Sequence, residues 1–237
     1  MDENTMQIAA GILGNSVSGA MTAEEMEEKA ENLLKEKYGE SFTVTRIYQQ
    51  KLFETYYSAQ CVADAAPEWR FMAYIDTEGD GMSDNYAERS VCTKIAEQMM
   101  ADMDGMPGTY HVYVRGLGPQ PTTAKPSIGI SEYLALDPEN TFEVYFYLVP
   151  EEQNAGLIYE ALSAGLKELQ MMKGLLHVCI LETDTLKDVL NYFDKYDNIY
   201  FVYRSIEQRV RDNEMEFENG SIKMDKKSFE ELMKEVL

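Results

Sequence analysis

The chain has 237 residues, enough for two domains of about 100 residues each or for one domain with a large extension. It carries 42 Asp and Glu against 21 Lys and Arg, a formal net charge of -21, so most of its surface repels phosphate backbones and anionic lipid headgroups. Nucleic acid is therefore excluded as an expected partner. The same charge either solvates the surface or suits cations or a basic partner protein. Hydrophobic residues make up 45% of the sequence, which predicts a folded chain with hydrophobic cores.

The cysteines and the hydropathy pattern bear on the compartment. Cys61, Cys92 and Cys179 lie far apart with no C-x-x-C pair, so the sequence suggests neither a disulfide framework nor a zinc knuckle. We expect the three cysteines to pack as small buried hydrophobic residues. No apolar run approaches the roughly 18 residues of a membrane-spanning helix, which predicts no direct membrane insertion. Taken as it stands, the sequence predicts a cytoplasmic protein. Residues 5–21 are uncharged and rich in small residues, so a surface-anchored or secreted protein with a separate N-terminal signal is the alternative.

The first third of the chain predicts a tail, a helix and a pair of strands. Residues 1–21 carry several glycines and no regular apolar pattern, which is typical of a flexible tail. Thr22-Ala-Glu-Glu25 is a capping box, and the apolar stripe that follows ends at Gly39, which predicts a helix between these residues. Residues 42–62 are rich in Thr, Tyr, Val and Ile and predict two antiparallel strands with a turn near 49–51. A loop is expected over residues 63–68.

The stretch from Trp69 to Met103 predicts a strand, an acidic loop (residues 76–84) and a helix. Apolar side chains alternate up to Ile75, the pattern of a half-buried strand. Ser83 or Asp84 is the expected N-cap of the helix, whose stripe should pack back on this strand: Val91, Cys92, Ile95 and Met99. A further strand over residues 110–115 completes a predicted first domain, residues 22–115, with the order α-β-β-β-α-β.

The Gly- and Pro-rich residues 116–126 predict a linker to a second domain, residues 127–237. The expected order there is a strand (142–148), a helix (158–169), a strand (175–181), a helix (185–193) and a strand (199–203). This alternation implies partly parallel pairing. Asn219-Gly220 predicts a terminal hairpin, and Ser228-x-x-Glu231 a capping box for a last helix. The expected fold class is α/β to α+β with two small domains.

Carboxylates of the acidic loop are the first candidate site. Asp76, Glu78, Asp80 and Asp84, with Gly81 among them, have the spacing of a loop whose oxygens converge on one cation. The stretch resembles the D-x-D-x-D-G loops of EF-hands and of calcium-binding type 3 repeats in surface proteins, over about 13 residues. The resemblance implies calcium as a cofactor.

Two features of the sequence depart from those loops. Ala87 stands where the bidentate carboxylate is expected, with Glu88 one position late, and a strand precedes the loop where an EF-hand has a helix. Two alternatives follow. Either the Asp, Gly and Ser residues bend and cap the backbone, or the loop binds calcium with millimolar affinity at best.

His177 and Cys179 are the second candidate site. They lie two residues apart on a predicted strand, so their side chains share one face, and Glu182 or Asp184 follows nearby. The alternatives are a nucleophilic site and ordinary packing in an apolar strand. His111 lies opposite the apolar face of its strand and is expected in solvent. No phosphate-binding loop is recognisable.

The sequence thus favours an acidic, soluble, non-catalytic binding or interaction module, an accessory protein of a bacterial assembly, with no catalytic residues assigned. The alternatives are a weak calcium-binding surface module using Asp76, Glu78, Asp80 and Asp84, and an enzyme with a site near His177 and Cys179. In its layout of a helix followed by a meander, the part up to Glu68 resembles bacterial surface-lipoprotein domains.

Overall fold

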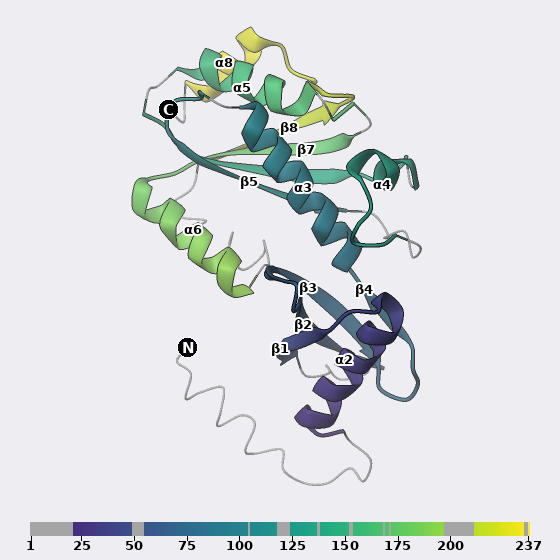
Figure 1. The fold of residues 1–237 in the computed structure, drawn as a ribbon. Coiled ribbons are helices and arrows are strands. Elements are labelled where there is room, and N and C mark those ends of the chain that lie inside the picture. Colours follow the sequence, from purple (N-terminus) through teal and green to yellow (C-terminus); the bar gives the residue numbers. More distant parts are fainter. Residues whose placement is uncertain are drawn as a thin grey trace.

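The structure is a computed structural model that describes residues 21–48, 55–103, 105–117, 124–136, 138–151, 154–167, 169–170, 172–196, 211–234 and 237. It contains a four-stranded sheet in the order β1-β2-β3-β4 and a five-stranded sheet in the order β5-β6-β7-β8-β9 (Figure 1). Helices accompany both sheets, so the expected mixed α/β to α+β class is confirmed.

Helix α2, Ala23–Tyr38, begins and ends where its sequence signals predict. The Thr22 side chain accepts a hydrogen bond from the Glu25 backbone N–H, the Glu25 side chain accepts one from the Thr22 N–H, and Gly39 ends the helix with a φ of 76°. Because these contacts satisfy backbone groups that the helix itself leaves unpaired, the element is determined locally.

The first sheet is an antiparallel meander that packs against α2. Its strands are β1 (Phe42–Tyr48), β2 (Tyr56–Ala63), β3 (Ala66–Asp76) and β4 (Met82–Asp84). The expected loop over 63–68 is wrong, because β2 and β3 continue to a tight turn between Ala63 and Ala66. The short strand β4 was not predicted. The core between α2 and this sheet consists of Ala30, Leu34, Phe42, Tyr57, Ala59, Cys61, Ala63, Phe71, Ala73, Ile75 and Tyr86.

Helix α3, Tyr86–Asp102, connects the two sheets. Its N-cap residue is Asn85, not Ser83 or Asp84, and Asn85 makes no side-chain capping bond to the helix. The Asn85 amide oxygen instead accepts a hydrogen bond from the Met72 backbone N–H at 2.6 Å, which continues the contact between β3 and β4 by one residue. The expected packing of the helix stripe on the preceding strand is also wrong, because Val91, Cys92, Ile95 and Met99 belong to the core of the second sheet.

The second sheet contains one parallel pair. Strand β6 (Phe142–Val149) pairs parallel with β7 (Lys173–Ile180), while β5 (Thr109–Gly116) and β8 (Arg211–Glu218) pair antiparallel on either side. Strand β9 (Ser221–Ile222) closes the hairpin at Asn219-Gly220, where both residues have positive φ, so the hairpin prediction is confirmed.

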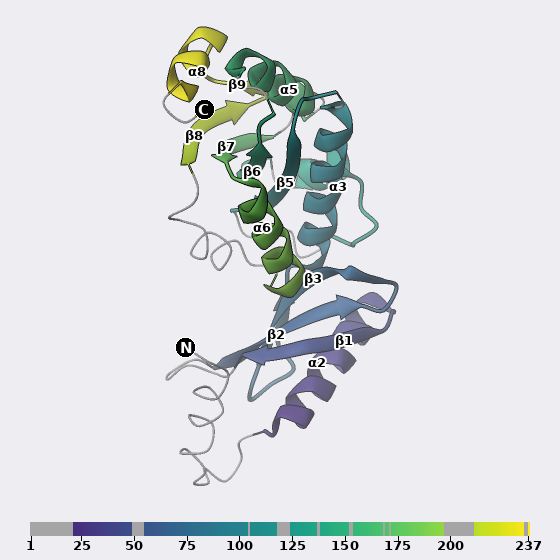
Figure 2. The ribbon, with the colours of Figure 1, turned by 90° about the vertical axis from the view of Figure 1, so that its left-hand side faces the viewer.

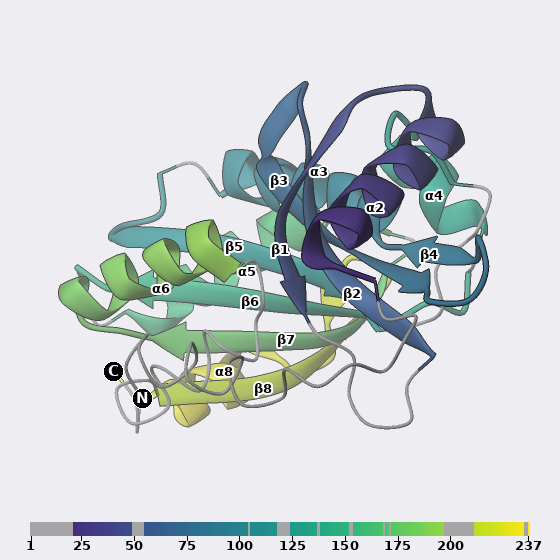
Figure 3. The same cartoon turned by 90° about the horizontal axis from the view of Figure 1, so that it is seen from below.

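Helices cover both faces of this sheet (Figures 2 and 3). One face packs against α3, α4 (Ile130–Leu136), α5 (Ala155–Lys167) and α8 (Lys226–Met233) around a large apolar core. The other face packs against α6 (Thr183–Tyr196) through a smaller cluster that includes Tyr113, Tyr145 and Tyr147. The N-cap of α8 is Asp225, which accepts from the Ser228 N–H, so the capping box expected at Ser228 is wrong.

The expected grouping of strands changes in one respect. The sequence assigned α3 and the strand at 110–115 to the first domain, but β5 pairs with β6 along its whole length and joins the second sheet.

Several predicted segments lie outside the described residues: the tail up to residue 20, the turn at 49–51, most of the linker and the strand at 199–203. All three cysteines are buried, as predicted. Within the described ranges, no helix is long and apolar enough to cross a membrane.

Candidate functional site

Asp76 shapes the acidic loop through its side chain. Its Oδ1 accepts hydrogen bonds from the backbone N–H groups of Glu78 at 2.9 Å and Gly79 at 3.3 Å. The Lys29 ammonium on α2 donates to two carbonyl oxygens of the same turn, Asp76 O at 2.9 Å and Gly79 O at 2.7 Å. A cation is therefore already supplied to this turn by the protein itself, and the Asp76 carboxylate is used to bend the backbone.

The side chain of Asp84 is fully buried. Its Oδ1 accepts from the Tyr38 hydroxyl at 2.7 Å and from the Tyr86 backbone N–H at 3.0 Å, and its Oδ2 contacts the Lys37 ammonium at 2.7 Å. Burial and the hydrogen bond to Asp84 raise the pKa of Tyr38 far above its usual range. Asp84 thus links α2, β4 and the start of α3.

The four carboxylates predicted as calcium ligands are therefore not brought to one point. Asp76 and Asp84 bond to different parts of the chain, and Glu78 and Asp80 are exposed. Across the ranges that the structure describes, no group of three or more His, Cys, Asp or Glu side chains is arranged to hold a metal ion. This geometry supports the backbone role of the loop.

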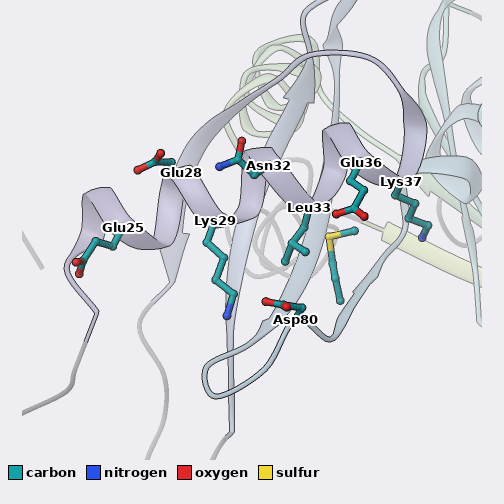
Figure 4. A pocket seen from close by; sticks show the side chains of 9 residues that line it. Glu25, Glu28, Lys29, Asn32, Leu33, Glu36, Lys37 and Asp80 are labelled. Atoms are coloured by element: carbon teal, nitrogen blue, oxygen red, sulfur yellow. The ribbon is translucent and has the colours of Figure 1, made fainter.

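A groove with a volume of about 780 Å³ runs between α2 and the acidic loop (Figure 4). Its apolar residues are Leu33 and Met82, both half-buried, and exposed carboxylates of Glu28, Glu36 and Asp80 surround them. The full lining consists of Glu25, Glu28, Lys29, Asn32, Leu33, Glu36, Lys37, Asp80 and Met82. We call this the α2 groove.

Charges in the α2 groove do not cancel. Its two lysines are engaged within the protein, Lys29 with loop carbonyls and Lys37 with Asp84. Glu25 caps its own helix, and its hydrogen bonds with Thr22 lower its pKa. Four carboxylates and two lysines line the groove, and Lys37 is already paired with Asp84, so the groove keeps a net negative charge beside its apolar side chains. The sequence offered one signal for it: Glu25, Glu28, Asn32 and Glu36 follow at helical spacing along a single polar stripe.

His177 and Cys179 do share one face of β7, the face covered by α6. The acid that joins them is Asp212 on β8, not Glu182 or Asp184. His177 Nδ1 lies 3.3 Å from Asp212 Oδ2, and Cys179 Sγ donates to Asp212 Oδ1 at 3.7 Å. Asp212 is the register partner of Cys179, a pairing between strands 33 residues apart that the sequence did not reveal.

The surroundings of this pair are those of a packed core. Cys179 is fully buried, and burial together with Asp212 raises the pKa of its thiol well above the usual range. The His177 ring stacks on Tyr145, with centroids 4.3 Å apart. His111 is not in open solvent, since its ring lies 6.0 Å from that of Phe193 on α6. Burial and the raised pKa both favour the neutral thiol of Cys179 over the thiolate.

The fold resembles that of a solved structure from a bacterium. A DUF5037 family protein from Ruminococcus gnavus ATCC 29149 matches with a TM-score of 0.63 and 16% sequence identity, over 89% of this chain and 99% of that chain. At this identity the similarity concerns the fold alone. No protein-family model matches the chain, and no curated protein matches it.

Proposed function

We propose that this protein is a non-catalytic interaction module that binds a basic segment of a partner protein in the α2 groove. The observation that carries the proposal is the combination of apolar side chains with an excess of negative charge, since four carboxylates line the groove against two lysines and one of these lysines is paired with Asp84. A partner segment with Lys or Arg on either side of an apolar residue has the complementary chemistry. The net charge of -21 adds long-range attraction for such a segment.

The non-catalytic part of the proposal is supported by the core around Cys179. A nucleophilic cysteine has to reach its substrate as a thiolate, whereas Cys179 is enclosed and its pKa is raised. A bacterial accessory role is part of the same proposal.

Charge reversal in the α2 groove tests the binding site. The variant Glu28→Lys/Glu36→Lys/Asp80→Lys is expected to weaken binding of a fluorescein-labelled peptide of alternating lysine and leucine by about tenfold or more, because three attractive contacts become repulsive. Fluorescence anisotropy at physiological salt, where long-range attraction is screened, measures the change.

The matched control changes the same net charge elsewhere. Glu24→Lys/Glu27→Lys/Glu231→Lys replaces three exposed acids that do not line the groove. We expect a change of less than about threefold, the size of a general charge effect. Equal losses in the two triple variants would show that only net charge attracts the peptide, and the proposed site would be wrong.

A further inference from the structure

Two exposed tyrosines lie side by side on the face of the first sheet opposite α2. Tyr56 is 39% exposed and Tyr74 41% exposed, and their rings meet edge to face with centroids 5.9 Å apart. Their chain neighbours Tyr57 and Ile75 are fully buried against α2, so the alternation of the strands directs Tyr56 and Tyr74 outward. Large aromatic side chains that stay exposed next to each other are typical of an interaction surface.

The pair lines a second groove, with a volume of about 480 Å³, which we call the tyrosine groove. Its other lining residues come from the residue before β2, the end of β3, the acidic loop and β4: Thr55, Asp76, Gly81, Met82 and Ser83. Met82 and the acidic loop also border the α2 groove. The two grooves therefore lie on the two sides of the short β4 segment.

One carboxylate, that of Asp76, lines the tyrosine groove. Burial raises the pKa of Tyr74, and Tyr56 and the carboxylate of Glu88 raise it further. Arg has a planar, weakly hydrated guanidinium that stacks on aromatic rings while its charge is attracted by carboxylates. A lysine ammonium is a compact, strongly hydrated charge and gains less from such a surface.

We infer that the tyrosine groove receives an arginine side chain of the partner, stacked on Tyr56 and Tyr74. The inference rests on the proposed function, because the arginine belongs to the same basic segment that occupies the α2 groove and crosses β4. Met82 lines both grooves, so one extended segment that passes over β4 reaches both. The α2 groove then selects for positive charge, and the tyrosine groove selects arginine over lysine.

Two labelled peptides of equal length and charge test this inference, one of alternating arginine and leucine and one of alternating lysine and leucine. Wild-type protein is expected to bind the arginine peptide about three- to tenfold more tightly, the size of a cation–π contact. In Tyr56→Ala/Tyr74→Ala this preference is expected to disappear. Tyr56→Phe/Tyr74→Phe keeps the rings and is expected to keep the preference. Leu117→Ala/Leu136→Ala removes exposed apolar side chains elsewhere and should change nothing.

The outcomes separate the two proposals. An unchanged preference in the double alanine variant would overturn the arginine site and leave the α2 groove standing. Loss of the preference in the phenylalanine variant as well would also overturn it, because stacking survives that change. If the wild-type protein binds both peptides equally, the arginine site is wrong. If it binds neither, the proposed function fails together with the inference. Circular dichroism of each variant confirms that the fold is retained.

Discussion

Gly174→Ala is expected to remove a large part of the stability of the protein. Gly174 is the second residue of β7 and the register partner of Phe142 in the parallel pair. A Cβ at this position would lie 1.8 Å from the Phe142 carbonyl oxygen and 2.8 Å from its carbonyl carbon. Both atoms are backbone in the neighbouring strand, so neither can rotate away. We expect a loss of about 4 kcal/mol or more, against a total of roughly 5–15 kcal/mol for an ordinary domain.

Urea unfolding followed by circular dichroism measures this loss. Gly129→Ala is the matched control, because a Cβ there meets no atom within 4 Å. Its cost should stay below about 1 kcal/mol. A Gly174→Ala protein as stable as that control would mean that β6 and β7 do not approach each other as described, and the parallel pairing at the centre of the second sheet would be in doubt.

Asp84→Ala is expected to cost about 3 kcal/mol, with or without calcium. The substitution removes the acceptor of the Tyr38 hydroxyl and the ion-pair partner of Lys37. Both contacts join α2 to β4, and a polar group that loses its partner in a buried network destabilises the fold. The measurement is urea unfolding of the variant and the wild type, each with millimolar calcium and with a chelator. Asp80→Ala, an exposed acid of the same loop, should change stability by less than about 0.5 kcal/mol.

The calcium hypothesis predicts a different pattern in the same experiment. If the loop held calcium, the chelator would destabilise the wild-type protein, and both Asp84→Ala and Asp80→Ala would remove that difference. The structural role assigned to Asp84 would therefore be contradicted if calcium stabilised the wild-type protein and neither variant. Calorimetric titration of the wild type with calcium gives an independent measurement.

Local signals predicted several elements correctly. The capping box at Thr22 and Glu25 and the glycine at position 39 fix α2, since all of these contacts lie within a few residues. Asn219 and Gly220 fix the terminal hairpin for the same reason, because both tolerate the positive φ of its turn. A weaker local signal failed: the helix expected to be capped at Ser228 is capped three residues earlier, by Asp225, whose side chain also suits an N-cap.

By itself, then, the sequence determined the elements with complete local signals, the mixed fold class and the strong negative charge. Only the tertiary structure decided that α3 and β5 join the second sheet, because an apolar stripe specifies that it is buried and not which sheet buries it. It also decided that Asp212 meets His177 and Cys179, and that the α2 groove and the tyrosine groove flank β4. Such contacts join residues far apart in the chain, and no spacing within one segment encodes them.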